Sequence, residues 1–184
     1  MDLPLGQLDH LLSASATDPD AQRQLTDLLA AAAHRALRRE RHASLETTDL
    51  ANEVYLRIAS DRDRGIEDAA HLRRFIARVT RNVLVDRART RNAEKRGGGQ
   101  VQVTWTEADH ATDGLQVEVL ALHHTLEQLR ELDERAAEIV ELRVFGGATA
   151  AEAGQVLGIS RATVQAEWSF ALTWMRKTLS RGAP

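Results

Sequence analysis

Apolar residues recur at spacings of three and four along nearly the whole chain of 184 residues. This spacing places them on one face of a helix, whereas a half-buried strand needs alternation. Aromatic residues make up only 4% of the chain and there are 3 prolines, so the expected core is aliphatic. The sequence therefore predicts an all-α protein.

Cysteine is absent. Its absence excludes a disulfide scaffold, a thiol nucleophile and a Cys-ligated metal site. No histidine cluster, paired carboxylates or nucleophile–base pair stands out, so we expect no metal, no cofactor and no enzymatic activity. No apolar run approaches the roughly 18–20 residues that span a bilayer, and the first ten residues carry acid where a secretory signal carries base. We expect a cytoplasmic protein with no membrane partner.

Charge is strongly segregated along the chain, although the net charge is only −3. Residues 71–96 hold nine Lys and Arg against two Asp and Glu, whereas residues 107–141 hold ten acids against two bases. A chain with its charges segregated in this way is expected to bind a charged partner, and the basic block is a candidate polyanion site. A solvated helix face is the alternative interpretation.

The basic block falls in a helix predicted over about 68–91. Its apolar stripe is expected to pack, and consists of Leu72, Phe75, Ile76, Val79 and Val83. Another face presents a row of arginines, namely Arg74, Arg78, Arg81 and Arg89. The polyanion interpretation fails if these guanidiniums are buried in internal ion pairs and no exposed cationic groove is left over.

Two small helical domains joined by a flexible linker are expected. Upstream of the basic helix, Asp18-Pro19 predicts a helix start, and a further helix is predicted over about 48–59. Three glycines at 97–99 end the basic helix, and residues 97–114 form the linker. Within it, VQVTWT is compatible with a short strand, but no partner strand is evident. The expected domains are 1–96 and 115–184.

The C-terminal domain ends in a predicted helix–turn–helix. Thr149 and Glu152 have capping-box spacing, so a helix should start near Ala150. Gly158 should end it in the left-handed conformation, Ser160 should cap the next helix, and Gly154 should allow a close approach. These offsets are typical of a DNA-binding motif, with an ordinary helical hairpin as the alternative.

The order of these blocks resembles bacterial sigma factors, most closely the small two-domain extracytoplasmic-function (ECF) group. The resemblance rests on LETTDLANEVYLRI, on the basic helix RRFIARVTRNVLVDRAR, and on the terminal helix–turn–helix. It implies a transcription initiation factor that binds core RNA polymerase and recognises and melts promoter DNA. Residues 1–96 are similar to the second sigma region and residues 115–184 to the fourth.

Site residues follow from the resemblance position by position. The face implied to bind core polymerase consists of Asp49, Asn52, Glu53 and Arg57, while Leu50, Val54 and Ile58 pack. The residues implied to contact the minus-ten element are Arg74, Arg78, Arg81, Asn82 and Arg89. Arginines would neutralise phosphates, and an amide can offer two hydrogen bonds to a base. Asp86 is expected to orient arginines rather than touch DNA.

The recognition helix departs from the family pattern. Its contacts to the minus-thirty-five element are implied to be Ser160, Arg161, Thr163 and Gln165. Relatives usually carry several Lys or Arg along this helix, but here Gln165, Ala166 and Glu167 follow Thr163-Val164. Fewer phosphate contacts predict weaker DNA binding with a flatter salt dependence.

A second departure precedes the core-binding helix, where Thr48 stands in place of an acid in the sequence ETTD. Some branches of the family with this change are thought to be activated by a serine/threonine kinase. Phosphate near a helix N-terminus is favoured electrostatically, so Thr48 is a candidate phosphosite. The alternative is that Thr48 caps the helix. An anti-sigma factor is the other regulatory partner that the resemblance implies.

Two competing interpretations stay open at this point. One is a one-component regulator whose N-terminal helices sense a partner and whose helix–turn–helix binds an operator. The other is a sigma-like interaction protein that has lost promoter use, which the acid in the recognition helix favours.

Overall fold

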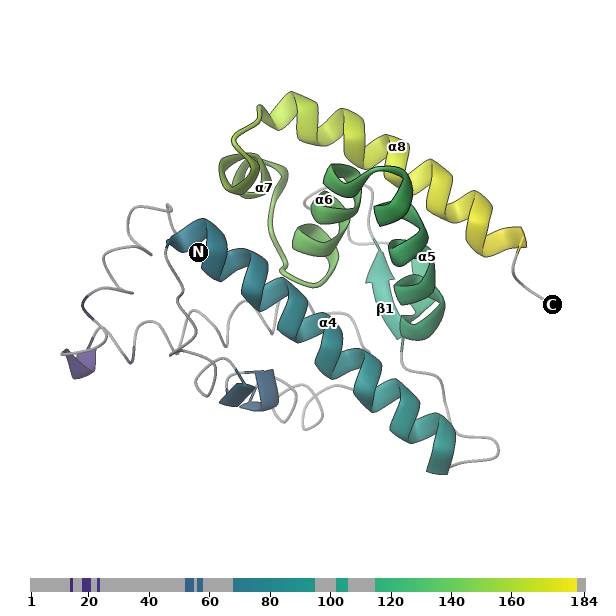
Figure 1. The fold of residues 1–184 in the computed structure, drawn as a ribbon, viewed down its shortest axis with the longest axis horizontal. Helices are drawn as coiled ribbons and strands as arrows, with labels where there is room; N and C mark the ends of the chain where they lie inside the picture. The colour runs from purple at the N-terminus through teal and green to yellow at the C-terminus, as the bar shows by residue number, and fades with distance from the viewer. Residues whose placement is uncertain are drawn as a thin grey trace.

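The computed structural model describes residues 68–94, 102–105 and 115–181, together with 14, 18–20, 23, 52–54 and 56–57 (Figure 1). The elements, labelled as in Figure 1, are helix α4 (Ala69–Glu94), strands β1 (Gln102–Trp105) and β2 (Leu115–Glu118), and helices α5 (Val119–Leu132), α6 (Glu134–Val144), α7 (Ala150–Leu157) and α8 (Arg161–Arg181). Helices dominate, and the all-α prediction is confirmed.

The strands β1 and β2 form a small antiparallel ribbon, with Gln102 opposite Glu118 and Trp105 opposite Leu115. The strand expected at VQVTWT therefore has a partner, which directly precedes α5. Each strand has only four residues, too few to show a clear alternation beside the helical pattern of α5. Part of the expected linker is thus paired with the start of the C-terminal half.

Helix α4 runs along one side of the C-terminal helices and lies against α5, α6 and α7 (Figure 1). Asp68 precedes it, and its carboxylate accepts a hydrogen bond from the backbone N–H of His71. The predicted apolar stripe is confirmed, since Leu72, Ile76, Val79 and Val83 are buried and Phe75 packs against them. The approach to the turn after α6 is close, because a Cβ at Gly146 would lie 3.1 Å from the Cβ of Ala77.

The C-terminal half is built around aliphatic side chains at helical spacing. Helix α5 buries Leu122, Leu126 and Leu129, which recur at spacings of four and three. Asp133 ends α5 and caps α6, where its carboxylate accepts from the backbone N–H of Ala136. Most side chains that fill the centre are aliphatic, joined by Phe145, Trp168 and Met175. The four helices α5–α8 therefore enclose one core.

The helix–turn–helix of α7 and α8 follows the local signals closely. The capping box of Thr149 and Glu152 is present, and α7 begins at Ala150. Gly158 has φ +67°, the left-handed region that suits glycine. A Cβ at Gly154 would lie 2.7 Å from the carbonyl oxygen of Ile159, so the turn requires this glycine. These predictions are confirmed.

Only part of the N-terminal half is described. Asp18 precedes a helical Pro19, and its carboxylate accepts from the backbone N–H of Asp20, which confirms the predicted cap. Val54 is buried, as expected for the apolar face of its helix. Thr48, Asp49, Leu50, Ile58 and the triple glycine lie outside the described residues.

Candidate nucleic-acid interface

The first turn of α8 presents the residues predicted to meet the minus-thirty-five element. Ser160 caps the helix, because its hydroxyl accepts from the backbone N–H of Thr163 at 3.0 Å. The hydroxyls of Ser160 and Thr163 also lie 2.9 Å apart, so each holds the other. Ser160 and Arg161 are exposed, and Thr163 is half-buried. The turn thus fixes three of the predicted contacts at one helix N-terminus.

Gln165 sits one turn further along α8 and is held by a neighbour. Its amide oxygen accepts from Nη1 of Arg143 at 3.1 Å, which leaves the amide N–H₂ as the donor end. The Arg143 guanidinium stacks over the ring of Trp168, 4.2 Å from its centre, in a cation–π contact. Trp168 is buried, so this stack fixes the orientation of Gln165 against a rigid core residue.

Glu167, the acid that departs from the family pattern, is neutralised within the fold. Both Nε and Nη2 of Arg135 donate to its two carboxylate oxygens. This contact, with the charge of Glu167, raises the pKa of the Arg135 guanidinium. Arg135 comes from the first turn of α6, and sequence spacing gave no sign of the pairing. The acid therefore does not stand alone on the recognition helix.

The arginine row of α4 is divided between paired and exposed members. Arg74 donates through Nε to Glu138 at 2.5 Å and through Nη2 to the carbonyl oxygen of Val156 at 2.9 Å. Arg81 is only 8% exposed and pairs with Glu127 at 2.6 Å and with Glu141 at 3.1 Å. The expectation of a continuous exposed row is therefore wrong for Arg81 and only partly right for Arg74. The cause is the acidic surface of α5 and α6, which lies against this face.

The remaining predicted contacts on α4 are accessible. Arg78, Asn82 and Arg89 are exposed, and Arg78 has no carboxylate partner among the described residues. Asn82 lies one turn after Arg78 on α4 and Arg89 two turns after Asn82, so accessible cations remain beside Arg74 and Arg81. The condition under which the polyanion interpretation fails is therefore not met.

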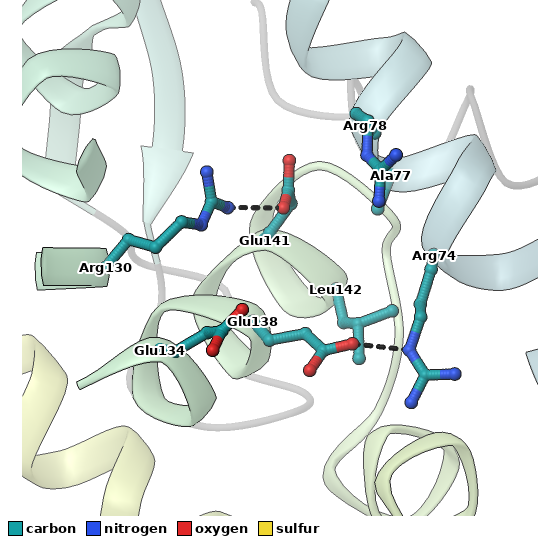
Figure 2. Close-up of a pocket in the computed structure, with 8 residues that line it drawn as sticks. All are labelled: Arg74, Ala77, Arg78, Arg130, Glu134, Glu138, Glu141 and Leu142. Carbon is teal, nitrogen blue, oxygen red and sulfur yellow. Dashed lines mark hydrogen bonds and ion pairs between the residues drawn. The ribbon is translucent and has the colours of Figure 1, made fainter. Parts of the chain in front are cut away.

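A cleft of about 330 Å³ opens where α4 faces α6. Figure 2 shows Arg74 reaching across it to Glu138, with Arg130 and Glu141 paired at the other end. Arg78 also lines this cleft. Its walls carry three arginines and three glutamates, so the charges match across the contact between α4 and the C-terminal half.

Arg81 belongs to an arginine–glutamate ring, which consists of Arg81, Glu127, Arg130 and Glu141. Arg130 pairs with Glu127 at 2.9 Å and with Glu141 at 2.7 Å, and Arg81 reaches the same two carboxylates. Burial raises the pKa of the Glu127 carboxyl, but the charges of Arg130 and Arg81 outweigh it and hold the pKa below its ordinary value of 4.5. Burial, and then the charge of Arg81, lowers the pKa of His123 below 6.5.

Glu152 joins the cap of α7 to α4. Its Oε1 accepts from Nη1 of Arg73 at 2.9 Å, while Oε2 accepts from the backbone N–H of Thr149 at 2.9 Å. Burial raises the pKa of the Glu152 carboxyl, but the Thr149 N–H and the Arg73 guanidinium outweigh burial and lower the pKa below 4.5. Local spacing predicts the cap, but it does not indicate Arg73 as the second partner of Glu152, 79 residues away.

The predicted core-polymerase face is partly engaged with α4. Asn52 is exposed, but Glu53 accepts from Arg57 at 3.2 Å and from Arg87 at 3.0 Å. Arg57 also donates to Asp86 at 3.2 Å, so Asp86 pairs with an arginine as expected. Arg57 and Asp86 are 29 residues apart, and no local spacing indicates their contact.

Fold and site together define a predominantly helical protein with a C-terminal helix–turn–helix and a basic helix packed against the C-terminal half. A sequence model of the ECF sigma factor family matches residues 11–181. The chain therefore belongs to the ECF sigma factor family, and its role is that of a sigma factor in transcription initiation. A search among curated proteins finds no match.

Two further surveys concern only the part of the chain that the structure describes. None of its helices combines the length and the apolar character needed to cross a bilayer. In the same residues, no three His, Asp or Glu side chains gather as metal ligands would.

Proposed function

We propose that this sigma factor binds core RNA polymerase and directs it to specific promoters, where it recognises and melts DNA without catalysing a covalent step. The observation that carries the proposal is the first turn of α8, where Ser160 and Arg161 are exposed on a fixed cap in a chain of the ECF family. A helix N-terminus presented in this way suits insertion into the major groove.

The recognition helix supports a weak contact with the minus-thirty-five element. Arg161 supplies a cation at its start, and Gln165 offers an oriented amide of the kind that pairs with adenine edges. Glu167 is neutralised by Arg135 rather than facing phosphates alone, which favours retained DNA binding over an interaction protein that has lost promoter use. The binding slope against salt is about −0.9 per neutralised phosphate, so few cations predict a shallow slope.

Minus-ten recognition and melting are assigned to α4. Arg78, Asn82 and Arg89 form its accessible strip, and Arg74 and Arg81 lie beside them under the C-terminal half. Asn52 is exposed on a helical segment that comes before α4 in the chain, which supports a polar contact with polymerase there. Strand opening then draws on binding energy to phosphates and unstacked bases.

In vitro transcription with purified core polymerase on a promoter library tests the proposal. The chain should direct specific initiation only together with core enzyme, and Arg161→Ala should lower the output of the selected promoters. Arg181→Ala, which removes an exposed arginine at the far end of α8, is the matched control and should change little. Binding of a duplex operator by the chain alone, as a dimer, would instead identify a one-component regulator.

Regulation through Thr48 or through an anti-sigma factor is part of the same proposal. Its support is the place of Thr48 before the helix that carries Asn52 and Glu53. A Thr48→Glu variant should be more active than Thr48→Ala in the transcription assay, since added negative charge near a helix N-terminus is favoured. Equal activity of the two variants would remove the kinase from the list of partners.

A further inference from the structure

Three arginines of α4 are bound by carboxylates that are far away in sequence. Arg73 pairs with Glu152 of α7, Arg74 with Glu138 of α6, and Arg81 with Glu127 of α5 and Glu141 of α6. The first three pairs span 79, 64 and 46 residues. We call this set the ionic clasp. It joins the basic helix to α5, α6 and α7.

The ionic clasp occupies the face of α4 assigned to DNA. Arg74 and Arg81 are seven residues apart and so lie two turns apart on one stripe, with Arg78 between them. A guanidinium whose donors are directed at a carboxylate does not simultaneously donate them to a phosphate. Arg81 is nearly buried, so nucleic acid reaches it only if the C-terminal half moves away.

The ionic clasp also accounts for the segregation of basic and acidic residues along the chain. The basic block 71–96 and the acidic block 107–141 carry opposite net charges of similar size, and the arginine–glutamate ring joins them. The carboxylates accept charge-assisted hydrogen bonds from arginine, the kind of bond that phosphates also accept. The acidic surface of α5 and α6 is thus a ligand for the basic helix within the same chain.

We propose that the ionic clasp is an autoinhibitory contact, in which the glutamates of α5, α6 and α7 compete with single-stranded promoter DNA for Arg74 and Arg81. This inference rests on the proposed function for its DNA-binding half, whereas closure itself is measured without DNA. The clasped form holds fewer accessible cations. The apparent DNA affinity of the chain is therefore the affinity of the open form multiplied by the fraction of molecules that are open.

The first experiment measures closure by resonance energy transfer. The chain has no cysteine, so Ala93→Cys on α4 and Gln128→Cys on α5, both exposed, take dyes at two positions only. Glu127→Gln/Glu138→Gln should lower the transfer efficiency, because it removes two carboxylates of the clasp at nearly constant shape. The control is Glu131→Gln/Glu134→Gln, which removes the same charge from the same two helices. Neither control glutamate pairs with an arginine in the described part of the chain.

The second experiment measures DNA affinity with the unlabelled variants and a dye-labelled single-stranded oligonucleotide. The clasp variant should bind at least about fivefold more tightly than the parent chain, while the control stays within about twofold. Circular dichroism checks that each variant keeps its helices. The exchange Arg74→Glu/Glu138→Arg reverses one ion pair instead of removing it. Its transfer efficiency should therefore lie closer to that of the parent than the efficiency of Glu127→Gln/Glu138→Gln does.

Each outcome decides between distinct claims. Unchanged transfer in Glu127→Gln/Glu138→Gln, with helices intact, would overturn the clasp, whatever the transcription assays show. Lowered transfer without tighter DNA binding would overturn the competition and count against α4 as the DNA contact. Equal effects in the clasp and control variants would show that loss of negative charge alone explains the result, and would overturn the specific role of the clasp glutamates.

Discussion

The helix–turn–helix of α7 and α8 and the contact of α4 with α5, α6 and α7 are determined by different kinds of interaction. In the first region the caps and the turn are set by residues within six positions of one another, such as Thr149 with Glu152. In the second region the decisive pairs join residues 46 to 79 positions apart. Caps and turn glycines close together in sequence thus specify the shape of the helix–turn–helix. Ion pairs between residues far apart in sequence specify which helices cover α4.

Trp168→Ala should produce the largest loss, about 3–5 kcal/mol of unfolding free energy, because a buried aromatic side chain is removed from the core of the helix–turn–helix. Arg143 loses its stacking partner as well. Urea denaturation followed by circular dichroism measures the change. Phe170→Ala, on the same helix but 48% exposed, is the control and should cost far less. Similar losses for both would mean that α8 is not packed as described.

Glu152→Ala sharpens the comparison, because this residue belongs to both regions. It should cost about 2–3 kcal/mol, since it removes half of the capping box and leaves the mostly buried Arg73 without this carboxylate. Thr149→Ala removes the cap but keeps the ion pair, and should cost about 1 kcal/mol. Equal losses in denaturation experiments would show that the bond to Arg73 adds no stability.

Gly158→Ala tests the local region alone and should cost about 1 kcal/mol, because a side chain is strained at φ +67°. No atom would crowd the added Cβ, so the loss measures backbone strain. Gly158→Asn should cost less, since asparagine tolerates the left-handed region. Thermal denaturation of the three chains gives the order, and an alanine variant as stable as the parent would contradict the turn geometry.

Acid should weaken the contact of α4 with the C-terminal half, and with it the cap of α7, which shares Glu152. Glu127 and Glu152 have lowered pKa values in the fold, so their stabilisation is complete above pH 4.5 and is lost as the pH falls through the folded-state pKa. The pKa of His123 is also lowered, so the unfolded chain binds its proton more readily and stability falls below about pH 6.5. Denaturation midpoints between pH 7 and pH 3 measure this. Glu152→Gln should flatten the acid limb, and an unchanged limb would contradict the assignment.

Much of the C-terminal half was predictable because its signals are short-ranged. The cap at Thr149, the turn at Gly158 and the buried stripe of Val164, Trp168 and Leu172 all follow from spacing along one helix. The strand pairing of β1 with β2 was not predictable, since four residues next to a helix carry too weak a pattern.

The candidate site was predictable in its composition but not in its pairing. Spacing placed Arg74, Arg78 and Arg81 on one stripe of α4, but it contained no information on which carboxylates would approach that stripe. Net charge identified the acidic block, yet any of its ten acids satisfies that count. Choosing Glu127, Glu138 and Glu141 requires the three-dimensional arrangement of α5 and α6.

The hydrogen bond from Arg74 to the carbonyl oxygen of Val156 has a consequence for how α4 and the helix–turn–helix influence each other. That carbonyl lies in the last turn of α7, where the helix itself supplies no amide partner. If Arg74 leaves this carbonyl, as the proposed competition by DNA requires, the C-terminal end of α7 must exchange its protein donor for water. By thermodynamic reciprocity, whatever steadies that last turn also changes how readily the arginine departs.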